Sequence, residues 1–447
     1  MVVTGEQTYC HQLGALELKS RVEQGTLSLR DYVAAMQAYS RAADTELQAF
    51  AHYSEEVINL QVERLEQMRQ SGYALPPLYG VPVSIKDNID TEDYPTEYGY
   101  AGAAGRTPRQ DAYLVHRLRA SGALILSKSR TTELAYFQPT ATLNPRVPGA
   151  TPGGSSSGSA AAVAAGLVPV AIGTQTNGSV IRPASFCGVF GFKPSRGLIF
   201  NGGVLRCSQS LDQVGVFARN LQDLAAAAQA MIGGHVDEAG RLVFPMNLRE
   251  ICELEPPMPP KLMFSRTPMW EQVDTVAQEA LLGLVAELGG CIAEVELHPS
   301  VANALPLHKT VMEAEMHANL SPLIEAAGGL ASAVTLALLE RGSKISATEY
   351  LRALERISLA TSGFDEYFDH FDAIVVPAAL GPAPQGLEST GDPIMSTIWT
   401  FSGLPCISLP LLQADDGRPI GVQLVGRLND DGRLLRTANW LIRSLGS

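Results

Sequence analysis

"TPGGSSSGSAAAVAAG" (residues 151–166) joins glycines and serines to a run of strong helix formers. A flexible linker would continue into more polar, low-complexity sequence. This stretch instead leads into "LVPVAIG" (167–173), an apolar run that is typical of a buried strand. A phosphate loop of the Walker type needs a lysine after its last glycine, and none follows here. The stretch therefore belongs to a structured core.

A third interpretation of this stretch is a nucleophile elbow. Gly154, Ser156 and Gly158 satisfy G-x-S-x-G, which carries the serine nucleophile of α/β-hydrolases at a turn between a strand and a helix. The preceding "TLNPRVPGATP" (142–152) contains three prolines, which central strands exclude. None of the eight histidines lies in a distinctive motif. These features argue against the elbow without excluding it.

The composition is that of a globular protein. Hydrophobic residues make up 46% of the 447 residues and charged residues 18%. The net charge of -13 would repel a phosphate backbone on average, so no nucleic-acid ligand is expected. The chain has neither a signal-peptide pattern at its start nor an apolar run of eighteen residues, so we expect a cytoplasmic protein without a membrane segment. Its six scattered cysteines are expected to be buried free thiols.

Alternation of strand and helix patterns predicts the fold class. "GVPVSIKD" (80–87) places Val81, Val83 and Ile85 on one face of a strand. "DAYLVHRLRASGALILSK" (111–128) indicates a helix, a glycine stop and a strand. Further strands are expected at 167–173, 372–378, 406–412 and 419–426. The pattern predicts one large α/β domain with a central, mixed β-sheet covered by helices on both faces.

Four segments are expected within this domain. Their predicted bounds are 1–75 for an N-terminal helical segment packed on the core, 76–240 for the core, 241–370 for a peripheral α/β and helical segment covering the pocket, and 371–447 for the C-terminal part of the core. Within the peripheral segment we expect a helix over 275–289, a strand over 291–297 and helices over 301–360.

Three blocks in fixed order carry a family resemblance. They are "GVPVSIKDNID" (80–90), "TPGGSSSGS" (151–159) and "GTQTNGSVIRPASFCGVFGFKPS" (173–195). Ser179 follows Ser155 by 24 residues and Lys86 by 93. The blocks and their separations resemble the amidase signature family of serine hydrolases. The resemblance runs from about residue 78 to the C-terminus and is weakest between 240 and 370.

The resemblance implies an amide hydrolase that needs no cofactor and no metal. Ser179 would be the nucleophile that forms an acyl-enzyme, Ser155 the bridging serine and Lys86 the base. The family also implies a cis peptide bond between Gly154 and Ser155. A lysine can accept a proton only when it is neutral, and burial favours its neutral form. The products would be a carboxylate and ammonia or an amine.

The resemblance also implies an oxyanion hole built from main-chain amides. By motif, the hole would use the N–H groups of Thr176, Asn177, Gly178 and Ser179. Most members have glycine where this chain has Asn177. Because asparagine tolerates left-handed backbone angles better than other non-glycine residues, the hole can survive this departure.

A second departure indicates the substrate. Arg182 stands one place later than the family's usual arginine, an arrangement similar to malonamidase-type members, in which the corresponding arginine holds the substrate carboxylate. We therefore expect a small amide that carries a carboxylate, although Arg182 could instead pair with a structural carboxylate. Arg130 is either a second anion contact or a support for its loop. Ser156 is also expected to bind substrate.

Other functions are also compatible with the sequence. The A subunit of glutamine-dependent tRNA amidotransferases is similar in fold and triad. The excess of acidic over basic residues and the displaced Arg182 argue against this assignment. An amidase or esterase for neutral substrates is a third candidate. Glu313 and His317 are four residues apart on an expected helix, but no third metal ligand accompanies them. The expected partner is a small-molecule amide, and a homodimer is compatible with the sequence.

Overall fold

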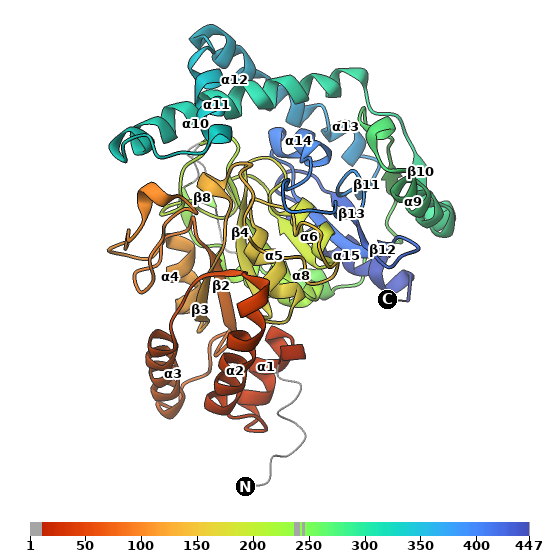
Figure 1. Ribbon diagram of the computed structural model, residues 1–447. Coiled ribbons are helices and arrows are strands. Elements are labelled where there is room, and N and C mark those ends of the chain that lie inside the picture. The colour runs from red at the N-terminus through yellow and green to blue at the C-terminus, as the bar shows by residue number, and fades with distance from the viewer. Residues whose placement is uncertain (1–10, 237–241, 244–245, 447) are drawn as a thin grey trace.

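An eleven-stranded mixed sheet forms the centre of the protein (Figure 1). The computed structural model describes residues 11–236, 242–243 and 246–446. The sheet confirms the predicted single α/β domain. Its strands, in spatial order, are β1 (Phe50–Tyr53), β3 (Leu124–Ser129), β2 (Pro82–Lys86), β4 (Val170–Gln175), β6 (Gln213–Ala218), β5 (Phe190–Lys193), β12 (Cys406–Gln413), β13 (Pro419–Val425), β11 (Ala373–Pro377), β9 (Leu262–Phe264) and β10 (Ile292–Glu294). A separate ribbon pairs β7 (His235–Val236) with β8 (Leu242–Val243).

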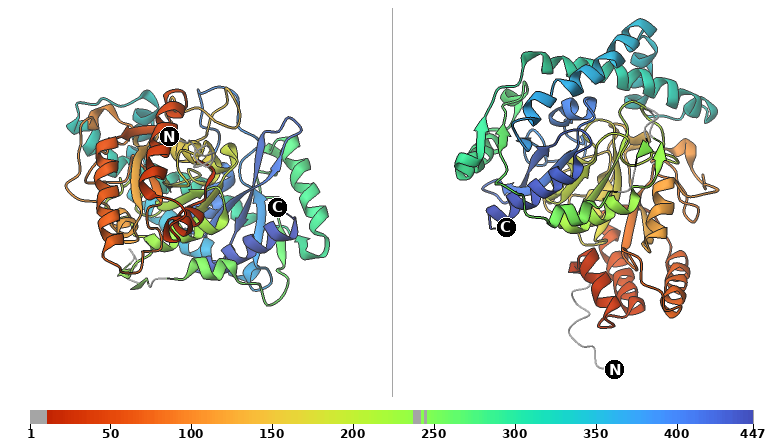
Figure 2. Two further views of the ribbon diagram at one scale, coloured as in Figure 1. Left: turned by 90° about the horizontal axis from the view of Figure 1, so that it is seen from below. Right: turned by 180° about the vertical axis from the view of Figure 1, so that it is seen from behind.

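Helices surround this sheet and extend beyond it at both ends (Figure 2). Their bounds are α1 (Ala15–Glu23), α2 (Leu29–Leu47), α3 (Glu55–Gln70), α4 (Tyr113–Ala120), α5 (Ser157–Ala164), α6 (Ile181–Cys187), α7 (Leu221–Met231), α8 (Leu248–Glu253), α9 (Thr275–Leu288), α10 (Ala304–Ala326), α11 (Ala333–Ser343), α12 (Ala347–Ser362), α13 (Asp365–Phe368), α14 (Ile394–Phe401) and α15 (Asp431–Ser444). The helices α1–α3 lie at one end of the molecule and α10–α12 at the other.

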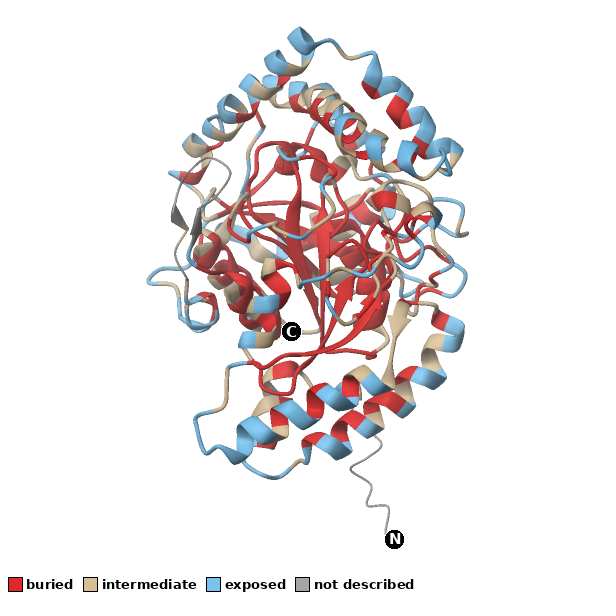
Figure 3. Ribbon diagram, turned by 90° about the vertical axis from the view of Figure 1, so that its left-hand side faces the viewer, coloured by how far each residue is buried: buried red, intermediate tan, exposed pale blue. Residues whose placement is uncertain are grey.

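The alternation of side chains along the strands produces two apolar layers. Ile172 of β4 and Val216 of β6 belong to the cluster that contains the inner face of α7. Ala171 and Phe217, their neighbours in the same strands, belong to the cluster that contains α5. Because successive strand residues point to opposite faces, α5 and α7 cover opposite faces of the sheet. Figure 3 shows the sheet buried between its helices.

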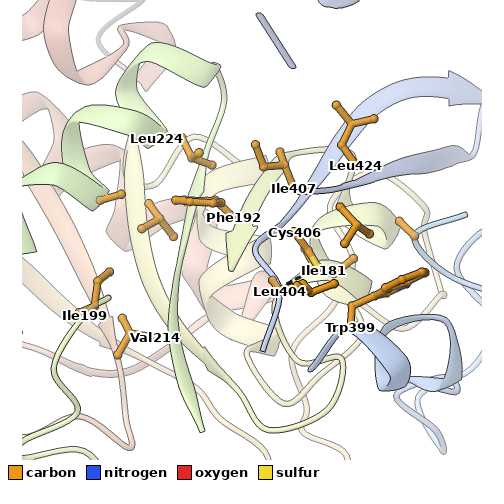
Figure 4. Close-up of a cluster of buried hydrophobic side chains, with 14 of the residues drawn as sticks. Ile181, Phe192, Ile199, Val214, Leu224, Trp399, Leu404, Cys406, Ile407 and Leu424 are labelled. Carbon is orange, nitrogen blue, oxygen red and sulfur yellow. Dashed lines mark hydrogen bonds between the residues drawn. The ribbon is translucent and has the colours of Figure 1, made fainter. Parts of the chain in front are cut away.

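The largest apolar cluster continues along the sheet to its C-terminal strands. Figure 4 shows Phe192 of β5, Ile407 of β12 and Leu424 of β13 in this cluster, together with Trp399 of α14. These side chains are fully buried. The C-terminal segment therefore completes the same core that the first 240 residues begin.

All the strands predicted from apolar runs are confirmed, and Val81, Val83 and Ile85 share one cluster as expected. The expected helices over 275–289 and 301–360 and the strand near 291–297 are also present, the last as the short β10. Six of the described strands were not predicted: β1, β5, β6, β7, β8 and β9. Five of them have only two to four residues, which is too short for a periodic pattern to emerge.

Local sequence signals mark the start of α2 and the end of α4. The side chain of Ser28 accepts a hydrogen bond from the main-chain N–H of Asp31 at the start of α2. The helix α4 ends before Gly122, whose φ of +82° suits glycine, and β3 follows two residues later.

The close packing of α5 explains the glycine in its first turn. A Cβ atom at Gly158 would collide with the main-chain oxygen of Ala49 and approach the main-chain nitrogen of Arg130 to 2.5 Å. The residues before α5 form a loop whose one bridge joins Ala150 to Gln385. A nucleophile elbow needs a strand in that place, so the G-x-S-x-G interpretation is excluded.

Five of the six cysteines lie in the described residues, and all five are free thiols. Four are buried as expected, whereas Cys291 is half-buried. Cys10 lies outside the described residues. None of the described helices is both long and apolar enough to traverse a lipid bilayer.

Candidate active site

Two parallel neighbouring strands bring the first candidate residues together. The strands β2 and β4 pair in parallel, with Ile85 opposite Ile172, so their carboxyl ends meet at one edge of the sheet. Lys86 is the last residue of β2 and Thr174 lies near the end of β4. The Nζ atom of Lys86 lies 2.8 Å from the Thr174 hydroxyl oxygen and 3.5 Å from its main-chain oxygen.

Lys86 is completely buried, and no carboxylate of the described residues pairs with it. Burial lowers the pKa of its ammonium group from 10.5 to about 7, an effect that the Cys207 thiol and the Asp212 carboxyl group oppose. A large share of Lys86 is therefore neutral near pH 7 and available to accept a proton.

Ser155 provides the next contact of Lys86. Its hydroxyl oxygen lies 2.8 Å from the Lys86 Nζ atom. The peptide bond between Gly154 and Ser155 is cis, as the family resemblance implies. The side chain of Ser155 is buried but lines a small cavity of about 20 Å³ that Ser179 also lines.

Ser179 lies in a loop between β4 and α6, which we call the Ser179 loop (residues 176–180). Its side chain lines the same cavity as that of Ser155. The Ser179 hydroxyl group forms no hydrogen bond with any residue that the structure describes. Lys86, Ser155 and Ser179 are thus brought together in the predicted order, with the contact between Lys86 and Ser155 already formed.

Gln175 organises the second half of the Ser179 loop. Its Oε1 atom accepts hydrogen bonds from the main-chain N–H groups of Val180, at 2.8 Å, and Ile181, at 3.1 Å. Its Nε2 atom donates to the Thr400 hydroxyl group at 3.0 Å. Neither Gln175 nor Thr174 was identified as a site residue from the sequence. The sequence feature that could have identified them is a polar residue at the end of an otherwise apolar strand.

The main-chain amides of Asn177, Gly178 and Ser179 have no hydrogen-bond acceptor among the residues that the structure describes. Three N–H groups that are free to donate, next to a serine hydroxyl, can stabilise a developing oxyanion. Neither Asn177 nor Gly178 has a positive φ, so the expected tolerance of left-handed angles is not needed at Asn177. Its Oδ1 atom instead accepts a hydrogen bond of 2.7 Å from Thr397.

Arg182 reaches the cavity from α6 and is only 2% exposed. Its Nη2 atom donates to the main-chain oxygen of Gly154 at 2.7 Å and to the Thr390 hydroxyl group at 3.3 Å. Its buried Nε and Nη1 atoms have no partner among the described residues. No described carboxylate lies within ion-pair distance of it. Burial lowers its pKa to about 10, an effect that the Asp392 carboxylate opposes. The guanidinium group is therefore buried at the cavity without an ion pair in the described part of the chain.

Two predicted substrate-binding residues, Arg130 and Ser156, do not line this cavity. The Nη2 atom of Arg130 donates to the Gln48 side chain at 3.0 Å, so Arg130 supports its loop. The hydroxyl group of Ser156 donates to the main-chain oxygen of Thr174 at 3.2 Å. Ser156 thus faces β4, because adjacent residues of the turn point in different directions.

The helix α10 covers the cavity, as expected for the segment between 300 and 360. Met312 and Met316 of this helix line the cavity together with Tyr136 and Phe137 of the loop after β3. Glu313 is paired with Arg341 at 2.7 Å. The described residues contain no group of three or more histidine, cysteine, aspartate or glutamate side chains suited to a metal ion.

Comparisons with known proteins agree with this geometry. The model of the family described as Amidase matches residues 31–435. Curated relatives include the A subunit of the glutamyl-tRNA(Gln) amidotransferase of Natranaerobius thermophilus, 30% identical over 478 residues, with 96% of this chain and 95% of that protein covered. The corresponding protein of Staphylococcus epidermidis is 30% identical over 468 residues, covering 94% and 95%.

Solved structures with a similar fold include an amidase. The native peptide amidase from Stenotrophomonas maltophilia superposes with a TM-score of 0.84 at 26% identity, covering 98% of this chain and 97% of that one. A protein from a vestigial complex that bears on the evolutionary origins of an s-triazine catabolic enzyme gives a TM-score of 0.89 at 25% identity, covering 97% and 99%.

Proposed function

Since this chain belongs to the amidase family and is an amide hydrolase, we propose that it cleaves small amides that carry a carboxylate, through an acyl-enzyme on Ser179. The products are a dicarboxylate or similar acid and ammonia or an amine. The observation that carries the substrate class is the buried guanidinium group of Arg182, which lines the cavity and has two unpartnered nitrogen atoms.

In this proposal the proton of Ser179 moves along the triad. Neutral Lys86 accepts the proton of the Ser155 hydroxyl group, Ser155 accepts the proton of Ser179, and the Ser179 oxygen attacks the amide carbon. When the C–N bond breaks, Ser155 donates a proton to the leaving nitrogen and regains one from Lys86. Water then attacks the ester by the same route and releases the acid. The 2.8 Å contact between Lys86 and Ser155 supports the first transfer.

The tetrahedral intermediate carries a negative charge on the former carbonyl oxygen. The free amides of Asn177, Gly178 and Ser179 are the donors available to it. Thr176, the fourth residue predicted for the oxyanion hole, lies at the start of the same loop. Because these donors are fixed before the reaction, they need no reorganisation as the charge develops.

Arg182 anchors the substrate carboxylate in this proposal. The alternative, a structural ion pair, would require a carboxylate within ion-pair distance; the charge of Asp392 acts on Arg182, but the two side chains form no ion pair. A buried guanidinium without a counter-ion is destabilising unless an anion binds it. A carboxylate that accepts a hydrogen bond from Nε or Nη1 would give the guanidinium group an ionic partner at an unpartnered nitrogen atom.

The test is ammonia release from pairs of amides that differ only by an α- or β-carboxylate. Loss of a buried charge-assisted pair costs about 2 to 5 kcal/mol, so Arg182→Met should lower kcat/KM about thirtyfold or more on the carboxylated member alone. Arg356→Met, on the exposed side of α12, is the matched control. Ser179→Ala should abolish turnover of every amide while the fold persists. An equal fall on both members of a pair would assign Arg182 to structure.

A second candidate is the glutamine-hydrolysing A subunit of a tRNA amidotransferase. The observation in its favour is the 30% identity to curated subunits of that name over more than nine tenths of both chains. Glutamine is itself an amide with a carboxylate, so the same anchor serves both candidates. Ammonia release from glutamine by the chain alone, without bound RNA or companion subunits, would favour an independent hydrolase. Release that depends on companion subunits would favour the amidotransferase.

A further inference from the structure

Two side chains outside the triad hold the main chain of the Ser179 loop. The Nε2 atom of His308 lies 2.9 Å from the main-chain oxygen of Thr176. The hydroxyl oxygen of Thr400 lies 2.5 Å from the main-chain oxygen of Asn177. His308 belongs to α10 and Thr400 to α14, so both contacts join the loop to segments far away in the sequence.

The chemistry of these contacts fixes which group donates. A carbonyl oxygen can only accept, so the Nε2 atom of His308 carries a proton and donates it to Thr176. Gln175 donates its Nε2–H to the Thr400 hydroxyl oxygen, which leaves the Thr400 proton for the Asn177 oxygen. Gln175 has this orientation because its Oε1 atom accepts two main-chain N–H groups.

A held carbonyl also determines the direction of the next amide. In a trans peptide the C=O of one residue and the N–H of the next point in opposite directions. The Thr176 oxygen held by His308 therefore aims the Asn177 N–H away from α10. The Asn177 oxygen held by Thr400 aims the Gly178 N–H away from α14. These N–H groups are two of the donors that the proposed oxyanion hole uses.

The environment of His308 suits a fixed donor. Its side chain is 1% exposed and belongs to the first half of α10. Burial lowers its pKa to about 4, so the imidazole is neutral at neutral pH. A neutral imidazole with its proton on Nε2 gives one donor of constant direction.

We propose that His308 and Thr400 are positioning residues that preorganise the oxyanion hole, and that α10 and α14 thereby control the catalytic rate. The inference rests on the proposed function, because it needs the Ser179 loop to stabilise an oxyanion. Without either donor, the Thr176–Asn177 or Asn177–Gly178 peptide is free to rotate and its N–H leaves the hole.

The test compares pairs of variants that remove or keep the donor. Removal of one oxyanion-hole donor lowers kcat about 10² to 10³-fold in other enzymes, so loss of its support by His308→Leu should lower kcat about tenfold to a hundredfold, with KM within about twofold. His308→Gln keeps a side-chain N–H and should recover most of kcat. His317→Leu, on the same helix but bonded to Ser321, is the matched control and should leave kcat unchanged.

Thr400 provides a second, nearly isosteric comparison. Thr400→Val removes the hydroxyl group and should lower kcat in the same way, whereas Thr400→Ser should restore it. This pair remains informative if His308→Leu folds poorly. A boronic acid analogue of the acyl group, which forms a charged tetrahedral adduct on Ser179, should lose affinity by the same factor as kcat/KM. The affinity for the carboxylate product should not change.

The outcomes separate this inference from the proposed function. Wild-type kcat in both His308→Leu and Thr400→Val, beside an inactive Ser179→Ala, would overturn the inference alone. A parallel fall in the affinities for the boronic acid and for the product would also overturn it, since the effect would then be on binding in general. Turnover by Ser179→Ala would overturn the proposed function itself.

Discussion

The Nζ atom of Lys86 lies 2.8 Å from the hydroxyl oxygen of Ser155 and the same distance from that of Thr174. Both serine and threonine hydroxyl groups are buried, and no described carboxylate neutralises the lysine. The charge of Lys86 is therefore destabilised by burial and stabilised by two hydroxyl oxygen atoms, with electrostatic support from Cys207 and Asp212. This balance sets the protonation state of the proposed base.

The pH dependence of the reaction should follow Lys86. Burial lowers its pKa to about 7, and the base acts only when it is neutral, so activity is present above this pKa and lost below it. We expect kcat/KM to fall about tenfold for each pH unit below about pH 7. Rates measured over a range from about two pH units below this pKa to about two above it, on a carboxylated amide, test this. A profile that stays level through the acidic half of that range would contradict the assignment of Lys86.

Thr174→Val should shift this profile to lower pH. The Thr174 hydroxyl oxygen accepts from Lys86 and also from the Asn88 side-chain amide, at 2.9 Å. A hydrogen bond to a charged group contributes about 1.5 to 3 kcal/mol, so its loss destabilises the ammonium form of Lys86 and moves the acidic limb of the profile down by about one to two pH units. Thr174→Ser, which keeps the hydroxyl group, is the control. A limb that moves to higher pH in Thr174→Val would refute this role.

The sequence predicted the triad because its residues lie in three local motifs at the ends of strands and in turns. Parallel pairing of β2 and β4 then brings Lys86 near the glycine-serine turn. His308 and Thr400 could not be found in this way. Each acts on the Ser179 loop over a long separation in sequence, 132 residues for His308 and 223 for Thr400, and neither has a local motif.

The contacts of two predicted substrate-binding residues depend on features that residue types do not show. Ser156 is expected from the sequence to bind substrate, but its hydroxyl group donates to the main-chain oxygen of Thr174 in β4. Arg130 was considered as an anion contact because of its place in a motif, but Gln48 of the N-terminal segment occupies its Nη2 atom. The direction of a side chain depends on the backbone of the turn, which residue types alone do not define.

Gly158→Ala should destabilise the fold. The added Cβ atom would collide with the Ala49 oxygen and the Arg130 nitrogen, which are main-chain atoms that cannot move aside cheaply. Overpacking of this kind costs about 1 to 3 kcal/mol. Gly283→Ala in α9, where a Cβ atom meets nothing within 4 Å, should instead stabilise by up to about 1 kcal/mol. Urea unfolding of both variants tests whether the free energy of unfolding falls in Gly158→Ala and rises in Gly283→Ala. Equal stability of the two would refute the packing argument.

Lys128→Met should destabilise the protein in a pH-dependent way. Lys128 is buried 3.3 Å from the Asp87 carboxylate, which immediately follows Lys86. Removing one partner of a buried pair costs about 3 to 5 kcal/mol, because the other charge stays buried alone.

The sign of the pH dependence follows from Asp87. Burial already raises its pKa above 3.8, and loss of the nearby cation raises it further. An acid whose folded pKa is raised contributes stability at low pH that is lost as the pH rises through the folded pKa. The loss of stability of Lys128→Met relative to wild type, measured by urea unfolding, should therefore be smaller at about pH 5 than at about pH 8. Adding Asp87→Asn to Lys128→Met should remove most of this pH dependence. A pH-independent loss in the single variant would show that Lys128 contributes through packing and its hydrogen bonds to Thr96 and Pro95, not through Asp87.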